Sequence, residues 1–479
     1  MKFITMKTLK QHNDEIEQIA KKIKQYSELG TAQKLRFFHG RTHSTRPQTD
    51  KNYTYINTSR LNGVIEVNSE QRYALVEPNV SMDKLVEKTL KYGLLPQVVP
   101  EFPGITCGGA VNGAALESSS YKYGQFSDTC EEYEIVLGNG EVVYVSAEKN
   151  KSLFYGISGA YGSLGLLSLI KIRLIPSSKY VHAAFHPMKS YEKTLKFIEK
   201  QIQKGEVDYI EGIIFHPRHA VVVTGKRVNF ATLPIKTYTK PFNPWFYEHV
   251  MEIAKQKNIY EELIPMKDYL FRYDRGAFWM GEFAFPLLRI PSNKFTKFLL
   301  NPFMSTRRLF DVLHSFNAGR VFVQDFYCPL DKSTKILKYN EKNLGIFPIW
   351  LCPVKPAKSP QKLSPHYISN KMLLDIGIWG KTYKYLHDVL AVNKEFESFV
   401  KKNNGRKMLY ACAYYTQKEF WSIYDKKWYG VLRKKYHADK AFPDIWEKVY
   451  VSGKYKFSYW KGLLKILMGK RYRYLGFGK

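Results

Sequence analysis

Cysteine is scarce in this chain, with five residues in 479, and no two of them form a Cys-x-x-Cys pair. Their scattered positions predict neither a disulfide framework nor a zinc site, and a reducing compartment is expected. The close histidine pairs have no carboxylate or thiol beside them, so no metal site is expected. The five thiols belong to Cys107, Cys130, Cys328, Cys352 and Cys412.

Long apolar runs are also missing. No stretch of about 18 apolar residues occurs, so no membrane-spanning helix is predicted, and the first residues do not have the pattern of a secretory signal. The expected location is intracellular, either cytoplasmic or peripheral on an internal membrane. Hydrophobic residues nevertheless make up 44% of the chain, which is enough for substantial cores, and the length favours two domains.

Acidic residues are few: 43 Asp and Glu stand against 74 Lys and Arg, which gives a net charge of +31. A field of this sign favours a negatively charged partner such as phosphate groups, anionic lipid or nucleic acid. The basic residues are spread over the whole chain, so a solvated basic surface without such a partner is an equal alternative. No nucleic-acid-binding motif is recognisable, and no nucleic-acid partner is expected.

The last segment, from Tyr450, has no acidic residue and eight Lys or Arg. Its apolar residues fall on one helical face, which is typical of a peripheral anchor on an anionic membrane. Packing of the same face on the protein body is the alternative. The residues of this face are Phe457, Trp460, Leu463, Leu464, Leu467 and Met468.

Apolar periodicity predicts an α+β fold, because strands alternate with few helices. Helices are expected over residues 8–29 and 82–92, with Gly93 as the C-terminal cap of the second. Strands are expected over residues 53–57, 63–67, 73–77, 134–137, 141–145 and 168–175. The predicted divisions are an N-terminal amphipathic helix (1–30), a first domain (31–180), a second domain (181–450) and a basic tail (451–479).

A Pro- and Gly-rich passage, Pro100–Gly113, is the strongest local signal. Glycines let the backbone approach a ligand closely, and successive backbone N–H groups can hold phosphate oxygens. The dinucleotide fingerprint of a Rossmann fold is not met, because Ala110 stands where its second glycine should be. A role in turns alone is the competing interpretation.

Several blocks recur in an order that resembles the FAD domain of the vanillyl-alcohol oxidase family, also called the p-cresol methylhydroxylase (PCMH) type. The resemblance covers about residues 35–180 and implies a two-part FAD-binding domain with FAD as cofactor. The blocks are His39–Pro47, Pro103–Gly109, Tyr123–Gly124, Leu137–Gly140, Ser152–Tyr155 and Gly162–Gly165.

The rest of the chain, to about residue 450, is similar to the delta-24 sterol reductases. This resemblance implies an α+β substrate or cap domain, NADPH as reductant, and an apolar, sterol-like substrate whose side-chain double bond is reduced. An FAD-linked alcohol or sugar oxidase of the same fold, and a basic binding protein that has lost catalysis, are the alternatives. The blocks that carry it include Glu117–Gly124, Glu211–Gly212, Ile264–Trp279, Val323–Asp325, Pro348–Pro353, Asp375–Gly377 and Met408–Ala411.

The resemblance assigns cofactor contacts residue by residue. The turn around His43 should hold the pyrophosphate; His43 either tethers the flavin covalently, as in some members of the wider family, or is an ordinary histidine. The later glycines and hydroxyls should line the diphosphate and flavin, with Gly165 on the adenosine side or supporting the same wall. The expected contacts are Gly40, Arg41, Thr42, His43, Ser44, Thr106, Gly108, Gly109, Asn112, Gly113, Glu117, Ser118, Ser119, Tyr123, Gly124 and Gly165.

Reduction of an isolated alkene needs a hydride donor, which reduced flavin supplies, and a positioned acid. Candidates for the acid and its neighbours are Tyr269, Arg272, Tyr273, Glu282 and Tyr410. In the reductases resembled, the positions of Phe271 and Tyr273 are typically histidines, which leaves the proton donor open. Alternatively, each tyrosine is a core aromatic whose hydroxyl is hydrogen-bonded. Arg272 and Arg275 could instead bind an NADPH phosphate.

Overall fold

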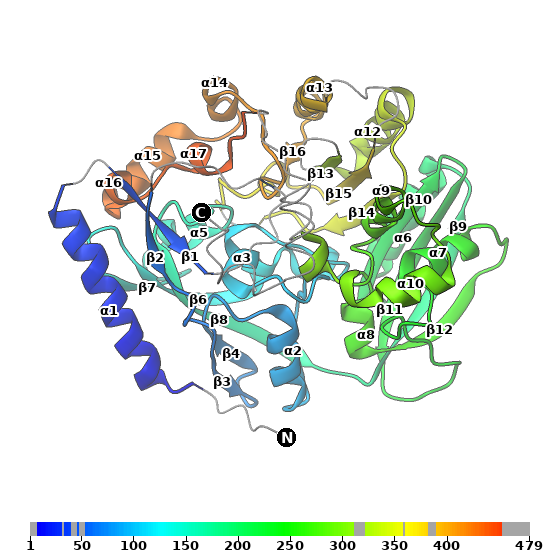
Figure 1. Ribbon diagram of the computed structural model, residues 1–479, viewed down its shortest axis with the longest axis horizontal. Helices are drawn as coiled ribbons and strands as arrows, with labels where there is room; N and C mark the ends of the chain where they lie inside the picture. The colour runs from blue at the N-terminus through cyan, green and yellow to red at the C-terminus, as the bar shows by residue number, and fades with distance from the viewer. Residues whose placement is uncertain are drawn as a thin grey trace.

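The computed structural model describes residues 7–30, 33–39, 46, 53–310, 321–357, 360–381 and 389–452. Two lobes lie side by side (Figure 1): the earlier part of the chain forms one around a smaller sheet, and the middle part forms the other around a larger sheet. Both sheets are antiparallel and carry helices, so the predicted α+β class is confirmed.

The first lobe is built on a sheet with the strand order β3-β4-β8-β6-β7, to which β5 is added beside β8. The expected strands and the helix over 82–92 are all present. The strand over 53–57 has the predicted ends and the others have shifted ends, and Gly93 has the positive φ of a C-terminal glycine. Its elements are β3 (Val64–Asn68), β4 (Tyr73–Val76), α2 (Met82–Leu90), β5 (Leu94–Pro96), α3 (Cys107–Asn112), α4 (Ser120–Tyr123), β6 (Cys130–Val136), β7 (Val142–Ser146), α5 (Lys151–Ile157) and β8 (Leu166–Pro176).

An outer layer on this lobe begins with α1 (Leu9–Glu28), which confirms the amphipathic helix expected over 8–29. Its buried face packs with the parallel pair β1 (Lys34–Phe38) and β2 (Tyr53–Asn57). Three helices near the end of the described chain return to the same lobe, where Ala438 and Phe442 join this apolar cluster. They are α15 (Lys426–Lys435), α16 (Ala438–Ala441) and α17 (Ile445–Val449). The predicted domain boundary at residue 450 stays a prediction. The chain returns to the first lobe before that residue, through the helices between residues 426 and 449.

The second lobe contains an eight-stranded sheet in the order β12-β9-β11-β10-β14-β15-β13-β16. One face is apolar and is covered by α6 (Tyr191–Lys204), α12 (Ser333–Tyr339) and α13 (Val389–Lys402). The strands are β9 (Tyr180–Met188), β10 (Tyr209–His216), β11 (His219–Val228), β12 (Tyr260–Pro265), β13 (Phe322–Pro329), β14 (Ile349–Val354), β15 (Leu373–Gly380) and β16 (Arg406–Lys407).

The opposite face of the large sheet adjoins the first lobe, because its side chains share one core cluster with residues of that lobe. Strand register places Glu211, Asp325 and Asp375 on this face, since each alternates with residues of the apolar face. The remaining helices are α7 (Phe246–Ala254), α8 (Met266–Leu270), α9 (Ala284–Leu288), α10 (Lys294–Leu300) and α14 (Gln417–Trp421). Burial of three carboxylates is costly unless they have a role, so this face between the two lobes is a candidate active site.

Candidate active site

The Pro- and Gly-rich passage forms a compact cradle in the first lobe. Thr106 caps α3, and its hydroxyl accepts a hydrogen bond from the backbone N–H of Gly109 at 3.2 Å. A Cβ on Gly108 would stand 2.6 Å from the Pro78 side chain, which explains the glycine there by close packing. Gly109 is exposed at the start of the helix, so backbone beside it is open to a ligand. The short helix in this passage was not expected from its composition.

A cationic cluster lies beside this cradle. The Asn112 side chain accepts from the backbone N–H of Gly162 at 2.8 Å, and the Lys448 ammonium donates to the Gly162 carbonyl at 3.2 Å. The Arg46 guanidinium lies over the Tyr161 ring, 4.9 Å from its centroid. Burial lowers the pKa of Lys448 well below its ordinary value, and the positive charges of Arg36, Arg46 and Arg433 lower it further. Such a cluster fits an anion, because a bound diphosphate would neutralise it.

A buried ion-pair network joins the two lobes. Arg272, from the second lobe, bonds Glu117 of the first lobe at 2.6 Å and Glu211 of β10 at 2.9 Å. The side chains of all three are almost completely inaccessible to solvent. The backbone N–H of Ile210 donates to the carbonyl of Ser118 at 2.9 Å, which holds the same two segments together. The segment around Glu117 therefore fixes the orientation of the lobes as well as lining their junction.

Aromatic hydroxyl and indole groups complete this network. The Tyr273 hydroxyl and the Trp350 indole N–H both donate to Glu211 Oε2, at 2.9 and 2.8 Å. The Tyr269 ring lies against the Arg272 guanidinium at 4.2 Å, and its buried hydroxyl has no hydrogen-bond partner among the described residues.

A second polar group lies on the same sheet face. Asp325 accepts hydrogen bonds from the Tyr410 hydroxyl and, at 2.9 Å, from the Trp379 indole. Burial raises the pKa of Asp325 to about 6 and that of Glu101, from the first lobe, to about 8. Burial and the charges of Asp325 and Glu101 also raise the pKa of Asp375 well above its ordinary value. Carboxyl groups that hold a proton near neutral pH are candidates for acid catalysis.

Aromatic rings stand between the two polar groups. Phe278 stacks on Tyr273, with ring centroids 4.0 Å apart, and contacts both Trp350 and Trp379 at 5.3 Å. Phe102 of the first lobe packs edge-on against Phe278 at 5.6 Å. The arrangement is thus an apolar wall flanked by carboxylates, a combination typical of sites for apolar ligands.

The other predicted residues have simpler surroundings. Glu282 bonds Tyr247, Ser292 and Lys297, none of which belongs to either polar group. The Ser119 hydroxyl donates to the Gln97 carbonyl at 2.9 Å. Two further glycines are required by packing, because a Cβ on Gly165 would stand 2.6 Å from Ile135 and one on Gly124 would collide with Asp128. Tyr123 is half-buried beside Lys122, and Gly113 accepts a long contact from Tyr161.

The predicted Gly40, Arg41, Thr42, His43 and Ser44 lie outside the described residues, as does the tail after residue 452.

Sequence reasoning missed the site roles of several residues. Glu101 stands inside the Pro- and Gly-rich passage, and Asp375 interrupts an otherwise apolar strand, Leu373–Gly380. A lone carboxylate in an apolar strand is the signal that marks it. Lys448 carries no comparable signal, because lysines are spread over the whole chain and this one reaches the cradle only through the fold.

Comparison with known proteins bears on the first lobe directly. Residues 12–146 match a family model described as an FAD binding domain. The first lobe is an FAD-binding domain. The whole chain was compared as well. Over 450 residues, which are 91% of this chain and 86% of the relative, the chain is 29% identical to the Delta(24)-sterol reductase of Mus musculus.

Two further relatives show how far the likeness extends. The chain is 28% identical to the Delta(24)-sterol reductase homolog of Caenorhabditis elegans, over 92% of this chain and 88% of that one. It is 28% identical to cytokinin dehydrogenase 1 of Arabidopsis thaliana over 30% of this chain and 25% of that one. The chain is an FAD-dependent oxidoreductase. None of the helices in the described part of the chain is long and apolar enough to cross a membrane.

Proposed function

We propose that this flavoenzyme reduces the side-chain double bond of a sterol, with NADPH as the reductant. The observation that carries the proposal is the likeness to Delta(24)-sterol reductases over 91% of the chain, because it extends through both lobes. The aromatic wall of Phe102, Phe278 and Trp379 supports an apolar substrate at the junction between them.

The FAD diphosphate is held, in this proposal, by the cradle around Thr106 and Gly109 and by the cations Arg46 and Lys448. Their mutual repulsion and burial fit a doubly charged anion at this place. The turn of residues 40–44 and the site of any covalent tether at His43 remain part of the proposal. When bound and reduced, FAD supplies the hydride that the alkene takes up.

The chain's own residues hold the two lobes in position and exclude water from their junction. The Glu117–Arg272–Glu211 network fixes the two lobes around the junction and orients Tyr273 and Trp350 toward Glu211. The Phe102, Phe278 and Trp379 rings exclude water, which strengthens every electrostatic interaction nearby.

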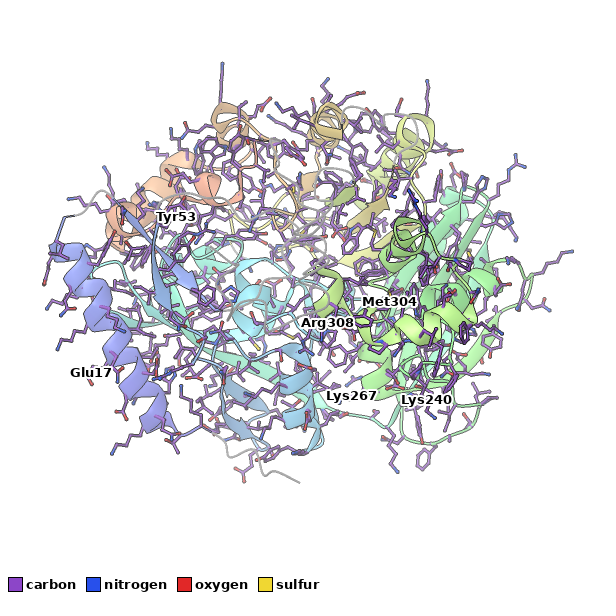
Figure 2. All side chains as sticks on the ribbon, in the orientation of Figure 1. Glu17, Tyr53, Lys240, Lys267, Met304 and Arg308 are labelled. Carbon is purple, nitrogen blue, oxygen red and sulfur yellow. The ribbon has the colours of Figure 1, made fainter. Side chains whose placement is uncertain are left out.

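Contact with an anionic membrane is the second part of the proposal, because a sterol has to be taken from a bilayer. Besides the tail, the described surface of the second lobe carries an apolar group: Phe242 and Phe295 are 78% and 68% exposed, and Phe242 stacks on Phe298 with centroids 4.5 Å apart. Lys240 lies beside it on the lower flank of this lobe (Figure 2). Exposed aromatics next to lysine suit the headgroup region.

Anaerobic titration of the purified holoprotein tests the reductase directly. Addition of NADPH should bleach the flavin, and addition of desmosterol, a sterol with a Δ24 double bond, should then restore the oxidised spectrum with formation of the saturated side chain. Bleaching by an alcohol or a sugar, with no response to NADPH, would instead identify an oxidase of the same fold.

A further inference from the structure

Asp375 is a buried carboxyl group to which the described residues offer no hydrogen-bond partner. It lies on β15, opposite Tyr327 of β13 and Cys352 of β14, on the sheet face that adjoins the first lobe. Its side chain is completely buried, and neither carboxyl oxygen has a hydrogen-bond partner among the described residues. A buried polar group without a partner costs about 1–3 kcal/mol, and in native structures such groups usually serve a ligand or a reaction.

The groups that face Asp375 keep it neutral. Asp325 and Tyr327 approach from β13, Cys352 from β14, Glu101 from the first lobe and Tyr410 from the segment after β16. Burial raises the pKa of Asp375 well above its usual range, and the carboxylates of Asp325 and Glu101 raise it further. Among the described residues no cation offsets these effects, in contrast to Glu117 and Glu211, which share Arg272. These effects favour the protonated form of the Asp375 carboxyl group.

Two of the neighbouring acids, Tyr410 and Asp325, are already engaged in hydrogen bonds. The Tyr410 hydroxyl donates to Asp325, so the hydrogen that Tyr410 would give is already engaged. Asp325 in turn accepts from both Tyr410 and Trp379. The carboxyl hydrogen of Asp375 is not held by any described residue. Trp379, which belongs to the aromatic wall, lies further along the same strand and on the same sheet face.

We propose that Asp375 is the catalytic acid that protonates the alkene, an inference that rests on the proposed sterol reduction. The carboxyl group transfers its proton to one alkene carbon, so that the π bond breaks and a C–H bond forms. The other, more substituted carbon supports the positive charge that develops and receives the hydride supplied by reduced flavin. The two electrons arrive with the hydride, and the carboxylate left on Asp375 regains its proton from solvent.

The decisive variant is Asp375→Asn in the full-length holoprotein. An amide has nearly the same shape as the neutral acid but cannot give up a proton at this site. NADPH should bleach the flavin of the variant at the wild-type rate, whereas reoxidation of the reduced flavin by desmosterol should slow by 100-fold or more. Asp331→Asn, at an exposed ion pair with Lys371, is the matched control and should reoxidise as the wild type does.

Two outcomes would overturn the assignment: an Asp375→Asn variant that desmosterol reoxidises at the wild-type rate, or one that binds FAD but is no longer bleached by NADPH. A wild-type protein that does not respond to desmosterol would instead refute the proposed function itself. The pH profile gives a separate readout. Wild-type reoxidation should fall as pH rises through the pKa of Asp375, and the residual rate of Asp375→Asn should lose that dependence. If Asp375→Asn does not fold, Asp375→Ser, which removes the acid and adds no bulk, takes its place.

Discussion

At the scale of single residues, Arg272 has the largest expected effect on stability. Its guanidinium compensates two buried carboxylates, so Arg272→Ala leaves Glu117 and Glu211 without a counterion. Loss of one partner from a buried ion pair costs about 3–5 kcal/mol, and urea unfolding should show a decrease of that size. Arg307→Ala is the matched control, because its pair with Asp83 is partly exposed and should be worth less than about 1 kcal/mol. Equal losses for the two variants would contradict the network's role.

Lys448 is the residue through which the FAD site can be tested without catalysis. Lys448→Ala should weaken FAD about tenfold, since a charge-assisted hydrogen bond contributes roughly 1.5 kcal/mol. Fluorescence titration of the apoprotein measures this affinity. Lys440→Ala, an exposed lysine on neighbouring α16, should bind FAD as the wild type does. An unchanged affinity in Lys448→Ala would remove this lysine from the phosphate site.

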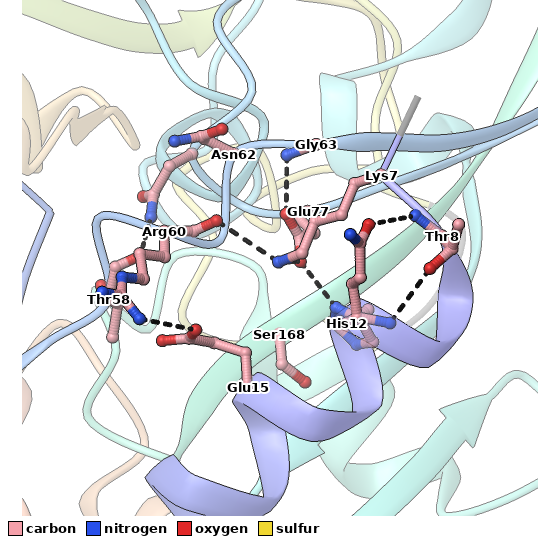
Figure 3. A network of polar contacts seen from close by, with 12 residues as sticks. Lys7, Thr8, His12, Glu15, Thr58, Arg60, Asn62, Gly63, Glu77 and Ser168 are labelled. Atoms are coloured by element: carbon pink, nitrogen blue, oxygen red, sulfur yellow. Dashed lines mark hydrogen bonds and ion pairs between the residues drawn. The ribbon is translucent and has the colours of Figure 1, made fainter. Parts of the chain in front are cut away.

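At the scale of elements, a buried histidine adds polar links between α1 and the first lobe to the apolar packing of this helix (Figure 3). His12 bonds Glu77 at 2.8 Å and Glu134 at 3.0 Å, and Lys7 reaches Glu77 as well. Burial opposes the charged imidazole, but the hydrogen bonds to Glu134 and Glu77 outweigh burial and raise the pKa of His12 from 6.5 to about 9. A pKa raised on folding contributes stability that is fully present below pH 6.5 and is lost as pH rises towards about 9.

We therefore expect α1 to loosen in alkali before the rest of the lobe. Amide hydrogen exchange of residues 9–28, corrected for the intrinsic rate, should lose protection as pH rises from 6.5 to about 9. His12→Ala should show the weaker protection already at pH 6.5, whereas His219→Ala, exposed at the start of β11, should behave as the wild type does. If the amide protection of α1 in the wild type is constant over this pH range, His12 does not hold the helix in the way described.

The sequence predicted elements better than it predicted the site. Alternation over Ser168–Ile175 and the apolar face of α1 are local patterns, so they predict β8 and the helix well. The short α3 was not predicted, since its glycines disfavour a helix and only Thr106 and the packing against Pro78 stabilise it. The meeting of Glu117 with Arg272 could not be read from spacing, because 155 residues separate them. That contact follows from lobe packing alone.

At the scale of the whole molecule, the net charge of +31 and the exposed aromatics predict membrane binding. The protein should sediment with vesicles that contain phosphatidylserine and should be released by salt. Phe242→Ser together with Phe295→Ser should reduce the bound fraction several-fold, because both apolar side chains are then lost from the interface. Val142→Ser, which removes an exposed apolar side chain on β7 of the first lobe, forms the control. If only the control changes binding, the contacting surface lies elsewhere.

The central claim is that the first lobe binds FAD. The most direct measurement is the visible absorption spectrum of the purified full-length protein, with the cofactor then released by acid precipitation and quantified. We predict a yellow protein with flavin absorption bands and about one FAD per chain, either copurified or taken up on addition of micromolar FAD. A folded protein that is colourless and does not bind added FAD would contradict the account.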